Sequence, residues 1–135
     1  MKLTTYLLFN GNCKPAMQFY HSVFGGDLTL TTVGESPMKG AFPPALHARV
    51  VNARLSSDVV DISASDWLRP TGTLVNGNSV AMYISGGTPD ATTALFQKLS
   101  DGAEVTDALS EQPFGLYGAL IDKFGIRWRF HAEAQ

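Results

Sequence analysis

Three cationic side chains alternate with large apolar ones in the stretch IRWRFH, residues 126–131. Arg127, Arg129 and His131 share one parity, and three apolar residues share the other. Side chains of a strand alternate between two faces, so this pattern predicts a half-buried strand with one cationic face. A guanidinium binds carboxylate or phosphate through two parallel hydrogen bonds, and an imidazole changes charge near neutral pH. The stretch therefore predicts anion recognition, provided that its cationic face lines a pocket.

A second alternating stretch, VVDISA at residues 59–64, places Asp61 and Ser63 on one face and aliphatic side chains on the other. His47 opens the preceding predicted strand, and its imidazole suits a proton shuttle, although a histidine hydrogen-bonded into a sheet is the commoner case. Flat apolar walls for an organic ligand are offered by Phe9, Tyr83 and Tyr117. These residues are the candidates for a binding site.

The elements that would position these residues occur twice in the same order, which is strand, helix and three strands. In the first half we expect strands at 4–9, 27–33, 47–55 and 59–64, and a helix that begins after Asn12 and ends at Gly25. In the second half we expect strands at 79–84, 103–109, 114–121 and 126–131, and a helix that begins at Thr88 and Pro89.

The repeat predicts an α+β fold of two βαβββ modules within one domain, at about 1–66 and 79–135, with a linker at 67–78. We expect the modules to pair and form a curved open sheet around a central cleft, with the helices on the outside. Alternation of side chains then predicts which residues line the cleft: Thr5, Phe9, Asp61, Ser63, Ser79, Tyr83, Arg127, Arg129 and His131. Tyr6 and Leu8 are predicted to face the helix instead.

Composition bounds the class of protein. The chain has 135 residues, 44% of them hydrophobic and 16% charged, with a formal net charge of -2. This balance argues against a nucleic acid or an anionic membrane as partner, since both would favour a basic surface. No apolar run reaches the roughly 18 residues of a membrane span, and a single cysteine, Cys13, cannot form an internal disulfide. We therefore expect a cytoplasmic protein without a membrane partner.

Several longer stretches resemble one known family. YLLFNGNCKPAMQFYHSVFGG, HARV, ISASD, ALFQKLSDGAEV and FGLYGALIDKFGIRW are similar to the PhnB-like branch of the vicinal oxygen chelate superfamily, which includes glyoxalases and bleomycin-resistance proteins. The resemblance covers nearly the whole chain, and it implies paired βαβββ modules and a homodimer. Members of the branch often carry the label demethylubiquinone methyltransferase. The sequence lacks the Gly-rich loop and following acidic residue that would hold a nucleoside cofactor.

Metal-using members of the superfamily hold one divalent ion with four side chains. The resemblance places those positions at Thr5, Asp61, Ser79 and Arg129. Only Asp61 is a good ligand, and a guanidinium has no lone pair to offer and repels a cation. We therefore predict that no metal is bound and no cofactor is needed. Arg129 would then bind an anionic ligand or form an internal ion pair with Asp61, and the sequence favours neither.

The resemblance and the cleft residues together predict a protein that binds a small organic, anionic molecule without a metal. The alternative is a lyase or dioxygenase that depends on one divalent metal ion and recruits His47 or His131 as ligands. A third possibility is a dimer with a closed cleft and a role in interaction alone. Neither the ligand nor the occurrence of a reaction follows from the sequence, because one fold serves many functions.

Overall fold

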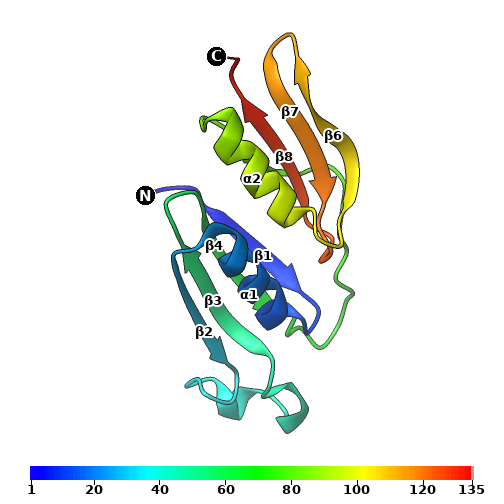
Figure 1. The fold of residues 1–135 in the computed structure, drawn as a ribbon. Coiled ribbons are helices and arrows are strands. Elements are labelled where there is room, and N and C mark those ends of the chain that lie inside the picture. The colour runs from blue at the N-terminus through cyan, green and yellow to red at the C-terminus, as the bar shows by residue number, and fades with distance from the viewer. Residues whose placement is uncertain (135) are drawn as a thin grey trace. The chain divides into compact units, whose positions relative to one another are not determined.

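A computed structural model describes residues 1–134, and the chain divides into two compact units. The first unit is Met1–Leu74, and the second begins at Val75. Each unit contains one four-stranded mixed sheet and one α-helix (Figure 1). Both units follow the strand–helix–three-strand order, so the α+β fold and its internal repeat are confirmed.

The first unit has the strand order β1-β4-β3-β2, with β1 parallel to β4 and the other neighbours antiparallel. Its elements are β1 (Thr5–Phe9), α1 (Cys13–Phe24), β2 (Asp27–Thr32), β3 (Val50–Ser56) and β4 (Asp61–Asp66). Two short 3₁₀ helices, η1 (Lys39–Ala41) and η2 (Pro44–Leu46), lie in the loop between β2 and β3. The helix α1 packs against β2, β3 and β4.

The second unit repeats this topology with the order β5-β8-β7-β6, and β5 is parallel to β8. Its elements are β5 (Met82–Ile84), α2 (Pro89–Leu99), β6 (Glu104–Gln112), β7 (Gly115–Ile121) and β8 (Arg127–Ala132). The strand β5 begins three residues later than the predicted strand at 79–84. The residues before it line a pocket.

Each sheet buries one face against its helix. In the second unit, Phe96 of α2 meets Phe130 of β8 edge-to-face, with ring centroids 5.3 Å apart. Gly118 of β7 leaves room for this contact, because a Cβ at that position would lie 2.9 Å from the Phe96 ring. Trp128 is also buried on this side. The opposite face of the sheet is therefore available for other side chains.

The two helices begin in different ways. The Oγ1 of Thr88 accepts a hydrogen bond from the backbone N–H of Ala91 at 3.1 Å, as the predicted cap requires. Asn12 is the N-cap residue of α1, as predicted, but its side chain accepts no capping hydrogen bond. The buried carboxylate of Asp66 accepts from the N–H groups of Gly11 and Cys13 instead, at 2.9 and 3.0 Å.

The predicted facing of β1 was wrong. Tyr6 and Leu8 pair with Ser63 and Ser65 of β4 and lie on the open face, where Tyr6 is 58% exposed. Phe9 lies on the helix side of the sheet together with Thr5 and Leu7, and it is 2% exposed. Residues of both parities in this strand are largely apolar, so alternation alone could not decide. The register with β4 decides it.

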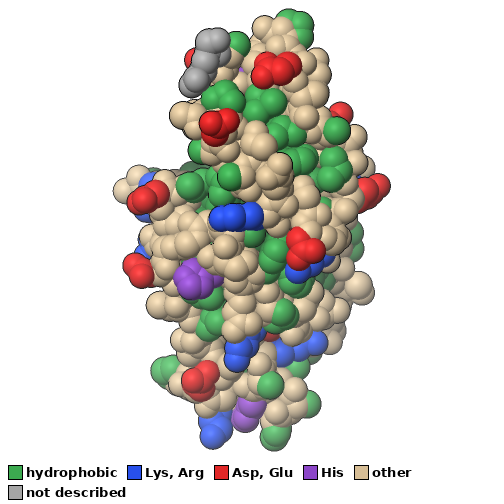
Figure 2. Space-filling model, viewed as in Figure 1, with side chains coloured by type: hydrophobic (Ala, Val, Ile, Leu, Met, Phe, Trp, Pro, Cys, Tyr) green, Lys and Arg blue, Asp and Glu red, His purple; other side chains and the backbone are tan. Residues whose placement is uncertain are grey.

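Among residues 1–134, no helix is long and apolar enough to span a membrane. On the face drawn in Figure 2, acidic and basic side chains are distributed among hydrophobic and uncharged ones.

Candidate functional site

The open face of the second sheet carries the cationic row predicted from the sequence. We call this surface the cationic face and define it by Arg127, Arg129 and His131 of β8, Tyr83 of β5, and Tyr117 and Ala119 of β7. On β8 the intervening residues Trp128 and Phe130 are buried against α2. Arg127 is half-buried and Arg129 is exposed, so both can reach a ligand.

Aromatic residues of neighbouring strands surround Arg129. Its Nη1 donates a hydrogen bond of 2.6 Å to the hydroxyl oxygen of Tyr117, and Tyr83 stands directly beside it on β5. The ring of Phe114 packs on Tyr117, with centroids 5.9 Å apart, and its carbonyl lies 3.0 Å from Nε2 of His131. The structure thus brings together three predicted site residues, namely Arg129, Tyr83 and Tyr117.

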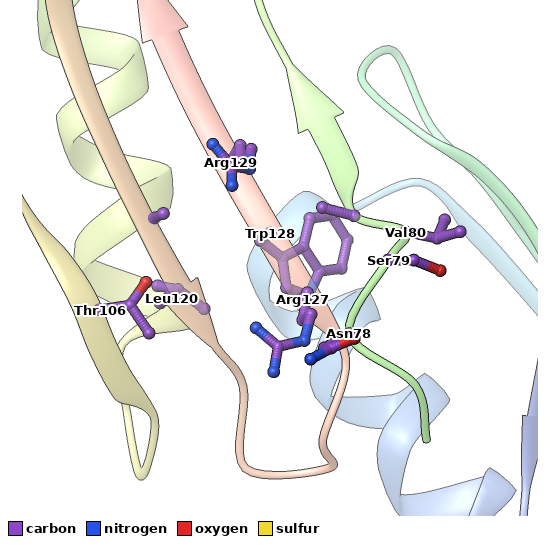
Figure 3. A pocket seen from close by; sticks show the side chains of 10 residues that line it. Asn78, Ser79, Val80, Thr106, Leu120, Arg127, Trp128 and Arg129 are labelled. Atoms are coloured by element: carbon purple, nitrogen blue, oxygen red, sulfur yellow. The ribbon is translucent and has the colours of Figure 1, made fainter. Parts of the chain in front are cut away.

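A pocket of about 290 Å³ opens beside the two arginines (Figure 3). Arg127 and Arg129 contribute charge to its wall, and Val80 and Ala81 contribute accessible apolar surface. The remaining lining residues are Asn78, Ser79, Thr106, Ala119, Leu120 and Trp128, of which the last three are buried. None of the described residues that line the pocket is acidic, so its charge is positive.

Two acidic residues in register with the arginines on the same sheet lie farther away. Glu104 and Asp107 are on β6, opposite Ile121 and Ala119 of β7. The strand β7 lies between β6 and β8, so β6 and β8 are roughly 10 Å apart in total. Among residues 1–134, neither Arg127 nor Arg129 forms an ion pair. The two guanidinium charges therefore lack a contacting carboxylate.

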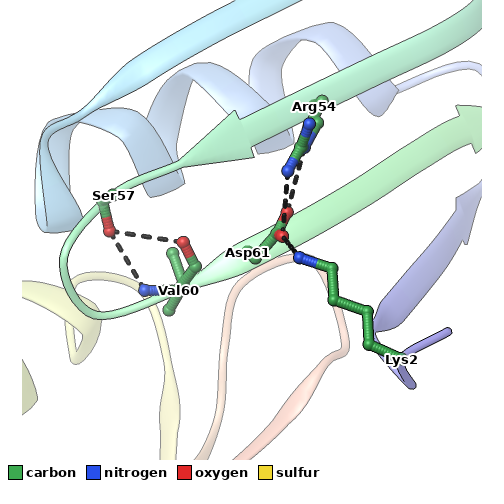
Figure 4. Close-up of polar contacts among 5 residues, drawn as sticks. All are labelled: Lys2, Arg54, Ser57, Val60 and Asp61. Carbon is green, nitrogen blue, oxygen red and sulfur yellow. Dashed lines mark hydrogen bonds and ion pairs between the residues drawn. The ribbon is translucent and has the colours of Figure 1, made fainter.

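Asp61 has its partners inside the first unit. Arg54 donates from Nε to one carboxylate oxygen at 3.1 Å and from Nη2 to the other at 3.0 Å, and the Lys2 ammonium lies 3.3 Å away (Figure 4). The hydrogen bonds from Arg54, with a smaller contribution from Lys2, lower the pKa of Asp61 below its ordinary value. Ser63 lies directly opposite Arg54 on β3. Asp61 therefore has a counter-charge without Arg129.

His47 and Phe9 do not take the positions predicted for them. His47 precedes β3 instead of opening it, and its Nε2 lies 3.0 Å from the carbonyl oxygen of Lys39 and 2.9 Å from that of Phe42. Both carbonyls are acceptors, so Nε2 carries the proton and fixes the loop that holds η1 and η2. Phe9 belongs to the core of the first unit. Neither residue is available to a ligand in the predicted way.

The four positions that the sequence resemblance assigns to a divalent metal do not suit one in this chain. Thr5 pairs with Ile62 on the helix side of its sheet, and Arg129 is a cation without a lone pair. Both oxygens of Asp61 are hydrogen-bonded to Arg54. Ser79 lines the pocket of the second unit. Within residues 1–134, no group of three or more His, Cys, Asp or Glu side chains could hold a metal ion.

Cys13 is a buried core residue. It is 0% exposed, and burial, together with the nearby carboxylate of Asp66, raises the pKa of its thiol from 9.0 to about 12. The thiol is therefore protonated at neutral pH and is a poor nucleophile.

The sequence did not reveal two buried carboxylates that hold the sheets in place. Asp66 accepts a third hydrogen bond from the N–H of Val50, at 2.9 Å, in addition to its two at the start of α1. Asp122 accepts from the N–H groups of Phe124 and Ile126 and from the indole of Trp128, the last at 2.8 Å. The only signal for Asp122 was its place at the start of the turn DKFG. It fixes the entry into β8.

Comparison with known proteins identifies the family. The profile of the 3-demethylubiquinone-9 3-methyltransferase family matches residues 1–131. Protein PA1353 from Pseudomonas aeruginosa is 26% identical, with a TM-score of 0.87 over 100% of this chain and 99% of that one. The PhnB protein from Bacillus cereus is 22% identical, with a TM-score of 0.75 over 98% of this chain and 99% of its own.

A glyoxylase/bleomycin resistance protein/dioxygenase domain from Frankia sp. EAN1pec shares the fold, at 14% identity and a TM-score of 0.64 over 100% of this chain and 93% of that one. No curated protein matches the chain. The chain shares its fold with these three proteins, and it belongs to the 3-demethylubiquinone-9 3-methyltransferase family.

Proposed function

We propose that the protein binds a small organic anion at the cationic face of its second unit, without a metal ion. The observation that carries this proposal is the pocket of about 290 Å³, which has two guanidinium groups in its wall and no carboxylate. A guanidinium without a counter-charge is well suited to bind a carboxylate through two hydrogen bonds. Apolar surface from Val80 and Ala81 supports the organic part of the ligand.

Chemistry of the donor set supports the metal-free form of this proposal. A divalent ion at the family's position would contact the guanidinium of Arg129, and the two charges would repel each other. Tyr117 holds that guanidinium by a hydrogen bond of 2.6 Å. Asp61, the one good ligand among the four positions, is neutralised by Arg54 and Lys2.

The methyl transfer named in the family's description receives no support from the strand–turn–helix corner of the first unit. A nucleoside cofactor is commonly held by free backbone N–H groups at such a corner. Here the N–H groups of Gly11 and Cys13 are both bonded to Asp66. The corner is therefore stabilised from within the protein.

The size of the pocket favours a small metabolite over a drug-sized molecule, because its volume of about 290 Å³ lies just below the usual range of roughly 300–1,000 Å³ for ligand pockets. Binding alone requires no catalytic group, so sequestration or transport of the anion is the function that the site supports. The homodimer and the cytoplasmic location stay predictions from the resemblance and the composition. Light scattering on the purified protein tests the first of these.

Calorimetry on the full chain at low ionic strength tests the proposal. Pentanoate should bind and the uncharged pentanamide should not, and Arg129→Gln should weaken pentanoate binding about tenfold or more, because a hydrogen bond between charged groups is lost. Arg54→Gln is the matched control, since Arg54 lies on the other sheet and should leave the affinity unchanged.

Two results would overturn the proposal. One is the absence of binding by pentanoate, pentanedioate and inorganic phosphate alike. The other is a stoichiometric zinc, iron or nickel ion in the purified protein, which would support the metal-dependent lyase or dioxygenase instead.

A further inference from the structure

We infer that the ligand carries two carboxylates, one for each arginine of the cationic face. This inference rests on the proposed function and adds the class of the ligand. Arg127 and Arg129 are two residues apart on β8, and both line the pocket (Figure 3). Side chains at this spacing leave the same face of a strand, from Cα atoms roughly 7 Å apart.

The two arginines are held differently, and this difference assigns them different roles. Tyr117 fixes Arg129 through the hydrogen bond of 2.6 Å, whereas the guanidinium of Arg127 forms no hydrogen bond or ion pair among residues 1–134. Arg129 is therefore the pre-oriented anchor for a first carboxylate. Arg127 is free to bind a second one.

A single carboxylate would leave one of the two positive charges without a partner in the pocket. The two guanidinium groups repel each other, and a ligand with one negative charge near each would relieve that repulsion at both. The hydroxyl oxygen of Tyr117 accepts from Arg129, so its own proton can be donated to a ligand oxygen. The site therefore offers a donor set for two anionic groups.

The distance between the arginines favours a linear dicarboxylate over one compact dianion such as phosphate. When both arginine side chains are fully extended, a single phosphate group is too small to contact the two guanidinium groups at once. A dicarboxylate with a chain of a few methylene groups can span the distance between them. Val80 and Ala81 supply apolar surface in the pocket, and Asn78 and Thr106 offer hydrogen bonds to a substituent. The acidic residues Glu104 and Asp107 on β6 limit how far an anion can extend across the sheet.

Calorimetry on the full chain with pentanedioate, pentanoate and inorganic phosphate tests this inference. Pentanedioate should bind at least about tenfold more tightly than pentanoate, and phosphate should bind more weakly than pentanedioate. Arg127→Gln should remove the preference for the diacid and leave the affinity for pentanoate within about threefold. Arg129→Gln should weaken both acids by about tenfold or more, and Arg54→Gln should change neither.

The outcomes separate this inference from the proposed function. If pentanoate binds through Arg129 and pentanedioate binds no better, the dicarboxylate inference is wrong and the anion site stands. If phosphate binds more tightly than pentanedioate, one compact dianion is the ligand class and the inference is wrong. If none of the probes binds, both fail. Circular dichroism of each variant checks folding, and Arg127→Lys, which keeps the charge, should retain part of the preference for the diacid.

Discussion

The open faces of the two sheets differ in whether their charged side chains have partners of opposite charge. On the first sheet, Asp61 is surrounded by Arg54 and Lys2, and its charge is balanced within 3.3 Å. On the second sheet, Arg127 and Arg129 have no contacting carboxylate among the described residues. Two units with the same topology thus differ in the property on which the proposed anion binding rests.

The difference teaches which parts of the repeat are constrained. A strand in this fold needs one apolar face to pack on its helix, and the other face can change without loss of the core. The first unit uses its open face for polar contacts within the protein. The second leaves charge exposed, so the candidate site belongs to that unit alone.

What the units share is a buried carboxylate that fixes the backbone. Asp66 joins the start of α1 to β3, and Asp122 joins the turn before β8 to the indole of Trp128. Each accepts three hydrogen bonds and is nearly buried, at 3% and 4% exposure. Removal of either would leave buried donors unpaired, which costs more than the loss of a surface contact.

The largest effect that we predict is a loss of stability when the buried carboxylate of the second unit, Asp122, is removed. Asp122→Ala should lower the free energy of unfolding by about 3–5 kcal/mol, because Phe124, Ile126 and Trp128 each lose an acceptor. Chemical denaturation followed by circular dichroism measures the change.

Asp101→Ala is the matched control for this prediction. Asp101 lies in the same unit and forms an exposed ion pair with Lys123 at 3.4 Å, so its loss should change stability by less than about 1 kcal/mol. Equal losses in the two variants would show that Asp122 is no more important than a surface acid.

The periodic parts of the fold could be predicted from the sequence. In β8 every second residue is large and apolar, so the buried and open faces were assigned correctly, including Arg129. In β1 the open face carries Tyr6 and Leu8. Alternation could not assign the faces of this strand, because both sets of alternating residues contain large apolar side chains. Alternation along a strand identifies its buried face only when one set of alternating side chains is apolar and the other is polar.

Contacts between residues distant in sequence could not be predicted in this way. Asp66 caps α1 from 53 positions away, and Tyr117 holds Arg129 from 12 positions away. Both contacts depend on the pairing of strands, which alternation does not specify. The cationic row was therefore predictable, whereas the partner that orients Arg129 was not.

Alkaline pH should distinguish the units, because only the first contains a thiol. Burial raises the pKa of Cys13 to about 12, so the unfolded state loses its proton first as pH rises above 9.0. Stability from this residue is present below pH 9 and falls by about 1.4 kcal/mol per pH unit above it. The stability advantage of the wild type over Cys13→Ala should therefore shrink between pH 9 and 11. A constant difference would contradict a buried, protonated thiol.

A new carboxylate should make the second open face resemble the first. Tyr83 stands beside Arg129 and is 61% exposed, so Tyr83→Glu would place an acid next to the guanidinium without disturbing the core. We expect pentanedioate affinity to fall about tenfold, with little change in melting temperature. Tyr83→Gln should lose less affinity, because it removes the ring without adding charge. An equal loss in both variants would assign the effect to the aromatic ring.

The smallest effect should come from Asp61→Asn, which makes the first face resemble the second. The ion pairs are exposed to solvent, so the melting temperature at neutral pH should fall only slightly. Arg54 lowers the pKa of Asp61, so the stabilisation is present above the ordinary value of 3.8 and is lost as pH falls through the lower folded value. Melting curves of variant and wild type should therefore converge in acid. If Asp61→Asn also gains measurable affinity for pentanedioate, an unpaired arginine on this fold is sufficient for anion binding, and without such a gain the pocket of the second unit is also needed.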